Sequence, residues 1–431
     1  MYIQEFSVGN FRSFKDINTL NMMATKSVSK YKEVDENNLI SKKDMDVKIL
    51  KTKAIYGANA SGKSNIIKAL STFTNIVKDS VVQKDAFFEL MPFMFSMECI
   101  EAPSFFQLIF WENGIRYRYG FEATQKEVLA EWLYHKPDKR EEPLFIREGM
   151  DIVELNKTSF AEGDMLLNVL GGEDKTKKLF RENALLLTTL SSFGIAEVSA
   201  KIVKSICSIK IISGLGNREL QYKAEEGLKD EKLKSYILKL LKVGDIGIKD
   251  IFSFELTDKE ELSEKNKKQL LLSTRMMYDS DGKIIEDTPS FVAFSEESEG
   301  TKKLFEMAPC IYEAFKNETP LIIDEFDARF HPMLTKEIIR LFQKNNLTSP
   351  QLVFTTHDIN LLDNKMFRKD QIDFVEKNSM GASHLYSLIE FKGVRNSVSF
   401  EDEYIKGKFG AIPYLGDFNK LFDLIDDGEE N

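Results

Sequence analysis

The sequence is poor in cysteine and lacks any long apolar run. Its three cysteines, Cys99, Cys207 and Cys310, lie about a hundred residues apart and form no CxxC pair, so neither a disulfide framework nor a thiolate metal site is predicted. No segment approaches the roughly 18 consecutive apolar residues of a membrane helix, and the first residues lack the pattern of a secretory signal. These absences predict a cytoplasmic protein with no membrane partner.

The chain also lacks an excess of positive charge. Its 59 basic and 69 acidic residues give a formal net charge of −10, which argues against a protein that coats nucleic acid over its whole surface. Hydrophobic residues make up 42% of the chain, including 33 Phe, and this is enough to bury a core. Because 431 residues exceed one minimal core, we expect a large domain carrying an insertion.

The apolar pattern predicts an α/β fold. Strands are expected over Tyr2–Phe14 and Lys51–Tyr56, and the Asn113-Gly114 pair between alternating residues predicts a hairpin within Leu108–Phe121. From about residue 176 to 243 the apolar period becomes helical. The clearest helical stripe consists of Leu233, Tyr236, Ile237, Leu240 and Leu241.

β structure is expected to return after the polar run 258–269. The segment Tyr278–Lys283 indicates a turn between two strands. Leu321–Ile323 and Gln351–Thr355 are short apolar runs that end at charged or polar residues. Such runs are typical of buried parallel strands with functional groups at their C-terminal ends.

A phosphate-binding loop is the strongest motif in the chain. Residues 57–64 read GANASGKS, which fits GxxxxGK[ST] at every fixed position, after a predicted strand and at the start of a predicted helix. Lys63 would neutralise the β- and γ-phosphates of ATP, and the hydroxyl of Ser64 would bind Mg²⁺. The residues predicted to contact the nucleotide here are Gly57, Asn59, Ala60, Ser61, Gly62, Lys63, Ser64 and Asn65.

Two adjacent carboxylates end the strand expected over Leu321–Ile323. Asp324 is predicted to hold the hydrated Mg²⁺, and Glu325 to activate the water that attacks the γ-phosphate. His357 follows the next apolar strand and could donate a hydrogen bond to the γ-phosphate. The remaining three histidines have no ligand-like spacing, so no metal site beyond the Mg²⁺ site is predicted.

Together these motifs resemble the Walker A motif, the Walker B motif and the switch histidine of ABC-type ATPases, the branch that includes SMC-like and RecF-like proteins. Shorter segments extend the resemblance to the AAA-15 group of that branch, which includes the RloA and AbiLi proteins and is related to the OLD family. These segments are Asn10–Phe14, Ser298–Thr301, Asp324–Asp327 with His331-Pro332, Thr355–Asp358, Arg368–Ile372 and Gly407–Pro413.

This resemblance implies a homo-oligomer built from head-to-tail pairs of ATPase domains. ATP would lie between the P-loop of one subunit and the signature serine, Ser298, of the other. Asp327 matches the D-loop position at the subunit interface, and Arg12 matches an N-terminal position that approaches the nucleotide. Two residues, Gln83 and Gln107, are alternative candidates for the Q-loop glutamine.

The resemblance also implies a domain organisation. We expect residues 1–160 to form the N-terminal half of the ATPase domain, with Walker A and an antiparallel sheet. Residues 161–250 would form a helical insertion that serves as an arm or lever. Residues 251–416 would form the C-terminal half with the signature, Walker B and the switch histidine, and residues 417–431 an acidic tail.

Two functions remain open on these grounds. The preferred one is the ATPase and sensor of a bacterial anti-phage system of the abortive-infection or restriction-linked kind, which controls a separate effector, a nuclease or toxin. Only 74 residues follow His357, which is too short for the C-terminal nuclease of OLD-type relatives. The alternative is a RecF-like or SMC-like repair ATPase that binds DNA directly through lysines of the insertion, with Lys234, Lys239 and Lys242 among them. A membrane-transporter ATPase subunit ranks last, because the signature and the insertion match it poorly.

Overall fold

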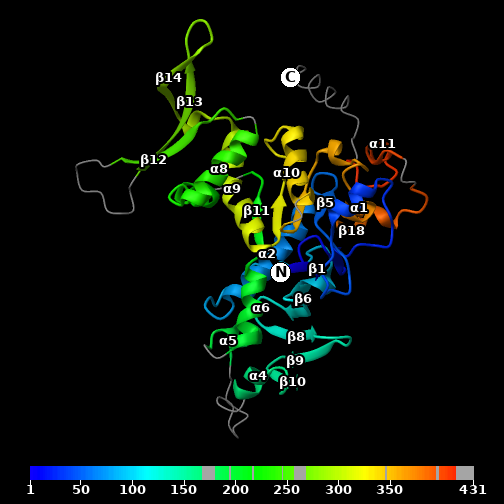
Figure 1. Cartoon of the computed structure of the whole chain (residues 1–431). Helices are drawn as coiled ribbons and strands as arrows, with labels where there is room; N and C mark the ends of the chain where they lie inside the picture. Colours follow the sequence, from blue (N-terminus) through cyan, green and yellow to red (C-terminus); the bar gives the residue numbers. More distant parts are fainter. Residues whose placement is uncertain are drawn as a thin grey trace, which may run out of the picture.

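The computed structural model describes residues 1–166, 180–193, 196–215, 218–244, 246–256, 268–344, 347–394 and 398–413. In these residues a central sheet lies between a large antiparallel sheet and a three-stranded sheet that projects from the opposite end (Figure 1). The predicted α/β fold, with a parallel core and a separate antiparallel sheet, is confirmed. The predicted acidic tail, 417–431, lies outside the described residues.

The central sheet has the strand order β11-β15-β16-β5-β17-β18. Neighbouring strands are parallel except β17 and β18, which are antiparallel. The strands predicted at the P-loop and at the two later apolar runs are β5, β15 and β16, so these predictions are confirmed, and their side chains are almost all buried, as a covered parallel sheet requires. The bounds are β11 Lys210–Ser213, β15 Leu321–Asp324, β16 Leu352–Thr355, β5 Thr52–Tyr56, β17 Ile372–Lys377 and β18 Ser383–Ser387.

The antiparallel sheet has seven strands in the order β10-β9-β8-β7-β6-β1-β2. The predicted hairpin joins β6 and β7, where Glu112 pairs with Ile115. Asn113 and Gly114 both have positive φ, 50° and 77°, as a two-residue type I′ turn requires. The bounds are β1 Tyr2–Gly9, β2 Asn18–Asn21, β6 Ser104–Glu112, β7 Ile115–Ala123, β8 Val128–Lys136, β9 Glu142–Glu148 and β10 Asp151–Leu155.

The first strand is shorter than predicted. β1 ends at Gly9, and the chain then turns back on itself, with Phe11 bridged to Phe14. Asn10 and Arg12 hold left-handed conformations, with φ of 45° and 51°. The strand prediction is therefore confirmed for residues 2–9 and wrong for residues 10–14, because alternating polarity alone does not distinguish a strand from a tight apolar turn.

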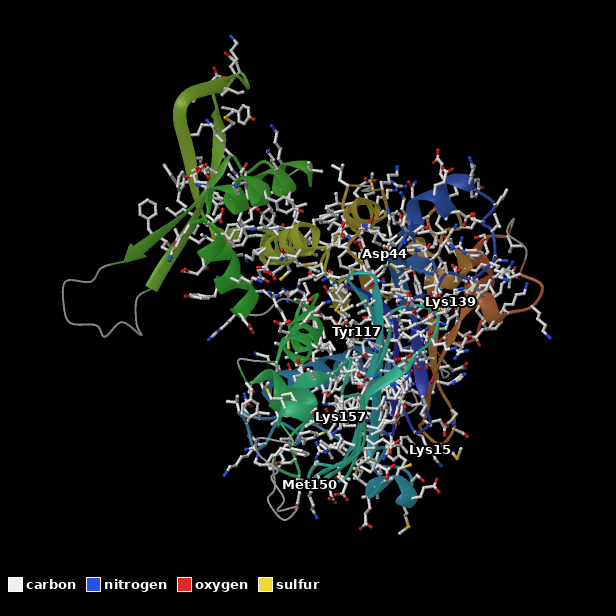
Figure 2. All side chains as sticks on the ribbon, turned by 60° about the horizontal axis from the view of Figure 1, so that its bottom comes forward. Lys15, Asp44, Tyr117, Lys139, Met150 and Lys157 are labelled. Atoms are coloured by element: carbon white, nitrogen blue, oxygen red, sulfur yellow. The ribbon has the colours of Figure 1, made fainter. Side chains whose placement is uncertain are left out.

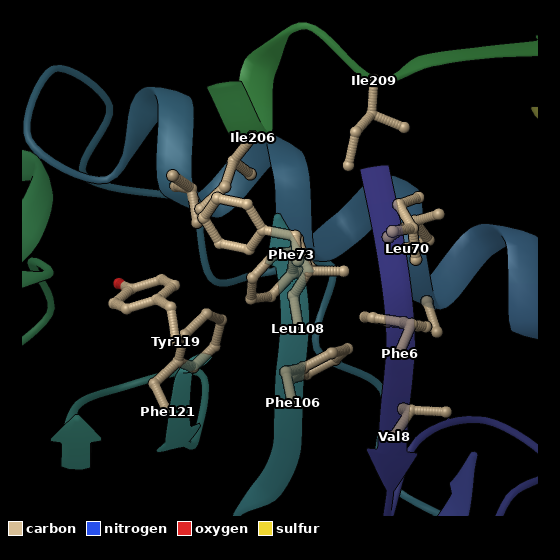
Figure 3. Packing of buried hydrophobic residues seen from close by; sticks show 14 of the residues in the cluster. Phe6, Val8, Leu70, Phe73, Phe106, Leu108, Tyr119, Phe121, Ile206 and Ile209 are labelled. Carbon is tan, nitrogen blue, oxygen red and sulfur yellow. The ribbon is translucent and has the colours of Figure 1, made fainter. Parts of the chain in front are cut away.

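Helix α2, Lys63–Asp79, lies between the central and antiparallel sheets. The Phe73 ring packs against Phe6 of β1, with centroids 5.8 Å apart, and is stacked on Phe121 of β7 at 5.6 Å. Figure 3 shows this packing, with Ile206 of helix α6, Glu197–Cys207, next to Phe73. Because α2 begins at the P-loop, its burial anchors that loop to both sheets.

In its described residues, the region predicted as a helical insertion contains helices and the strand β11. Helix α8, Glu231–Val243, buries Ile237 and Leu241 from the predicted apolar stripe. Between α6 and helix α7, however, strand β11 joins the edge of the central sheet beside β15. The helical period does not reveal this strand, because four residues are too few to show a period of two. The other helices are α4 Ala161–Leu166, α5 Leu186–Ser191 and α7 Arg218–Gly227.

The three-stranded sheet comprises β12 Asp250–Leu256, β13 Lys268–Tyr278 and β14 Ile284–Ala293. The predicted turn between β13 and β14 is confirmed, since the Asp279 amide donates to the Lys283 carbonyl. Figure 2 shows Tyr117 of β7 within the crowded body of the molecule, whereas β13 and β14 extend away from it. β14 is followed by the short 3-10 helix η3, Phe294–Glu296, and then by the long helix α9, Glu299–Asn317.

The remaining elements are short apart from helix α10, which contacts β5 of the central sheet. They are α1 Lys32–Asn38, β3 Leu39–Ile40, β4 Ile49–Leu50, α3 Met97–Ile100, η3 Phe294–Glu296, α10 Pro332–Lys344, η4 Ile359–Leu361, η5 Lys369–Gln371, η6 Leu388–Glu390 and α11 Phe400–Ile405.

Candidate functional site

The predicted nucleotide site lies where β5, β15 and β16 end. β5 leads into the loop 57–62, and α2 starts at Lys63 with Gly62 as its N-cap at φ 113°. A Cβ at Gly62 would lie 2.3 Å from the Ser383 hydroxyl, and one at Gly57 would lie 2.4 Å from the Val375 carbonyl. Both positions therefore need glycine, and the loop's amide groups end at a helix N-terminus that favours anions.

Lys63 is held inside the loop that precedes it. Its ammonium donates to the carbonyls of Gly57 at 2.8 Å and Ala58 at 2.9 Å. Burial lowers the pKa of Lys63, while the carboxylates of Asp324 and Glu325 raise it. The positive charge thus lies beside the two acids predicted to act with it. Asn59 and Ala60 are exposed on the same loop, and Ser61 is buried.

Asp324 is the centre of a hydrogen-bonded group at the end of β15. Its Oδ1 accepts from the Ser64 hydroxyl at 3.1 Å and from the Thr355 hydroxyl at 2.6 Å. The same Thr355 oxygen accepts from the Glu325 amide at 2.7 Å. The structure therefore joins the end of β16 to both predicted acids and to the serine that opens α2.

Glu325 has an unusual backbone conformation for a residue with a side chain. Its φ is 53°, a left-handed value that costs roughly 1–2 kcal/mol outside glycine. Gly214, which follows β11, donates its amide to the Asp324 carbonyl at 2.6 Å. A Cβ at Gly214 would lie 2.1 Å from the Glu325 carbonyl oxygen, so only glycine allows the chain to pass here.

A family model supports what this geometry indicates. The model described as "AAA domain, putative AbiEii toxin, Type IV TA system" matches residues 54–164 and 212–363. The chain belongs to this AAA-domain family. No curated protein matches the sequence. Within the described ranges, no helix has both the length and the apolar character needed to cross a membrane.

Solved structures with a similar fold include heads of SMC proteins. The SMC head domain from Thermotoga maritima is 14% identical with a TM-score of 0.40, covering 90% of this chain and 99% of that one. An SMC head bound to the C-terminal winged-helix domain of ScpA is 13% identical with a TM-score of 0.43, covering 90% and 98%. One from Pyrococcus furiosus is 12% identical with a TM-score of 0.38, covering 95% and 99%.

In this AAA domain, His357 lies beside the acids that follow β15. Its amide donates to both oxygens of Asp327, at 3.2 and 3.3 Å. The pKa of His357 is lowered, first because the surrounding atoms displace water and second because the positive charge of Lys63 repels a positive charge on the ring. The negative charge of Asp327 acts in the opposite direction. The ring is thus biased toward its neutral form.

The N-terminal turn at residues 10–14 contacts the P-loop through serines. The Ser13 hydroxyl oxygen accepts from the side-chain amide of Asn65 at 2.7 Å and from the Ser383 hydroxyl at 2.8 Å. The Ser383 hydroxyl also lies 2.5 Å from the Ser61 carbonyl oxygen. Arg12 lies next to Ser13, and its Nε is buried without a hydrogen bond in the described part of the chain. Asn65 is thus joined directly to this turn, whereas the contacts of Arg12 are its amide with the Met91 carbonyl and its guanidinium over the Phe11 ring.

Ser298 stands apart from this group. It is the N-cap of α9, where its hydroxyl accepts from the Thr301 amide at 3.2 Å. Within the described residues its side chain makes no hydrogen bond to the P-loop, Asp324 or Glu325. The site of one chain thus assembles the Walker residues without Ser298. Gln107, one of the two Q-loop candidates, accepts instead from Trp132 within the antiparallel sheet.

Several lysines suggested for DNA binding have neighbours of their own. Lys234 pairs with Asp250 at 2.9 Å, and its ammonium lies over the Phe252 ring. Lys210 lies 3.6 Å from Glu313. Two of the lysines considered for direct DNA binding are therefore occupied by contacts with an acid, and one of them also with an aromatic ring.

Sequence reasoning missed three participants in the site. Thr355 lies in the segment Thr355–Asp358, and its position at the end of a predicted strand was the available signal. Ser383 and Gly214 are far from the motifs in sequence, and no local pattern marks them. Their importance follows only from which strands are neighbours in the sheet.

Substitution of Gly214 by alanine tests the close approach to Glu325. The added methyl group should displace the Asp324–Glu325 turn and lower the free energy of unfolding by about 1–3 kcal/mol. Urea titration followed by circular dichroism measures the change. Gly247→Ala is the matched control, because its Cβ would lie 3.5 Å from Arg275, an ordinary contact. Equal stability of the two variants would contradict the packing argument.

Proposed function

We propose that this protein binds ATP with Mg²⁺ and hydrolyses it to ADP and phosphate. The observation that carries the proposal is the hydrogen-bonded group of Ser64, Asp324 and Thr355 next to the P-loop lysine. A hydroxyl and a carboxylate oxygen at one point are hard ligands that suit Mg²⁺. When bound, Mg²⁺ would neutralise negative charge on the phosphates.

Each residue of the nucleotide site has a distinct role in this proposal. The amides of loop 57–62 and the Lys63 ammonium bind the β- and γ-phosphates. Ser64 and Asp324 hold the metal ion. Glu325 orients the attacking water and accepts its proton, and the neutral His357 ring donates a hydrogen bond to the γ-phosphate.

We further propose that the complete site forms between two head-to-tail copies. Ser298 is at the start of a helix, where it would bind the γ-phosphate held by the partner subunit. Its lack of hydrogen bonds to the P-loop of its own chain is consistent with this role in trans. By the family resemblance, Arg12 would approach the nucleotide from the N-terminal turn, whose Ser13 contacts the P-loop residue Asn65.

The biological role we propose is the ATPase sensor of a cytoplasmic anti-phage system, which controls a separate effector. Support comes from the resemblance to the AAA-15 group, with its RloA and AbiLi proteins, and from the family description, which names "putative AbiEii toxin, Type IV TA system". Direct DNA binding, the alternative, is less supported, because Lys234 is paired with Asp250.

A Glu325→Gln variant should bind ATP and Mg²⁺ but hydrolyse ATP at least about a hundredfold more slowly, because the proton acceptor is lost. Its solution mass, measured by light scattering, should rise when ATP is added, since the paired state is trapped. Lys63→Ala is the control and should show neither binding nor a mass change. Undiminished hydrolysis by Glu325→Gln would remove Glu325 from the mechanism.

Mixing two inactive variants tests whether Ser298 acts in trans. Asp remains a good N-cap, so Ser298→Asp should fold, while its charge repels the γ-phosphate. A mixture of Lys63→Ala and Ser298→Asp forms pairs with one intact site, and about a quarter of wild-type ATPase activity should return by chance pairing of equal amounts. If Ser298 acted within its own chain, the mixture would stay inactive.

The effector proposal is tested by purification from the native locus. Wild-type protein should retain a neighbouring gene product, and Lys63→Ala should change the amount retained, because nucleotide controls the partner. Because protein contacts hold the partner, the association should survive both nuclease treatment and 0.5 M salt. Recovery of DNA alone, lost after nuclease, would favour the RecF-like alternative.

A further inference from the structure

Lys303 is a buried lysine that the functions described so far do not use. It lies in the second turn of α9, five residues beyond Ser298, and is 2% exposed. Burial lowers its pKa to about 7, although the charge of Asp327 acts in the opposite direction. Burying an ammonium group costs free energy unless the group is hydrogen-bonded. The hydrogen-bond partners of Lys303 therefore indicate what it does in the fold.

Those partners are backbone atoms of the loop that follows Glu325. The Lys303 ammonium donates to the Phe326 carbonyl at 2.7 Å and to the Ala328 carbonyl at 2.5 Å. It also lies 4.1 Å from the centre of the Phe330 ring. These contacts flank Asp327 on both sides, and Asp327 accepts from the His357 amide.

The first turn of α9 contacts the same loop a second time. Glu299 pairs with Arg329 at 2.8 Å, and a Cβ at Gly300 would lie 3.0 Å from the Arg329 carbonyl. The helix that presents Ser298 is thus attached to the loop from Phe326 to Phe330 at two levels. A displacement of the helix start must move this loop, because both carbonyl contacts and the ion pair are short.

We infer that Lys303 is a positioning residue that transmits the placement of α9 to Glu325, Asp327 and His357. Engagement of Ser298 with a partner's nucleotide would then set the geometry of the hydrolytic acid in its own chain. This inference rests on the proposed ATPase function and adds a regulatory link between two sites of one pair. A methionine here would fill similar volume but leave two carbonyls without a donor.

The test compares Lys303→Met with Lys303→Arg and with Lys316→Met, a change near the end of the same helix. Lys303→Met should lower kcat about tenfold or more while KM for ATP changes less than about threefold, because the P-loop contacts are untouched. Lys303→Arg should restore most of kcat, since it keeps the charge and the donors. Lys316→Met should behave as wild type.

A purely structural role would change stability without this split between kcat and KM and without rescue by arginine, and that result would overturn the inference. If Lys303→Met does not fold, Glu299→Gln decides, since it breaks the exposed pair with Arg329. A fall in kcat of about threefold at unchanged stability would support the link, and an unchanged kcat would overturn it. Absence of ATP hydrolysis by the wild-type protein would instead defeat the proposed function, and the inference with it.

Discussion

The parallel register of β5, β16 and β15 is the constraint on which the site depends. Ile55 pairs with Thr355, and Phe354 pairs with Ile323, so the three strands end at one level. Because successive side chains of a strand point to opposite faces, a slip of one residue would turn the Thr355 hydroxyl away from Asp324. The apolar burial of these short strands therefore determines the chemistry at their ends.

A strained turn follows from the same register. Glu325 holds a left-handed backbone that is stabilised from two neighbouring strands, by the Thr355 hydroxyl on one side and the glycine after β11 on the other. Strain of this kind persists only where surrounding contacts determine it. Here it directs the chain from the metal-binding acid into the loop that carries Asp327.

The loop after Glu325 is also where the two halves of the proposed composite site meet. Helix α2 holds the P-loop in place through the packing of Phe73, and helix α9 holds the loop after Glu325 in place through Lys303. In the proposed arrangement, α2 would contact the nucleotide bound by its own chain, and α9 would present Ser298 to the nucleotide of a partner. A nucleotide between two copies would then act on both helices, as the proposed sensor requires.

The sequence alone determined the parts of this protein that depend on local spacing. The P-loop, the acids after an apolar strand, the Asn113-Gly114 hairpin and the α/β class were predicted because each rests on neighbouring residues. Tertiary structure decided the rest: that residues 10–14 turn rather than extend, that β11 joins the central sheet, and that Ser383 and Gly214 contact the site. The contacts of Ser383 and Gly214 join residues far apart in the chain, such as Ser383 and Ser61. They form only because the order of the strands in the sheet brings these residues together, and no local pattern specifies that order.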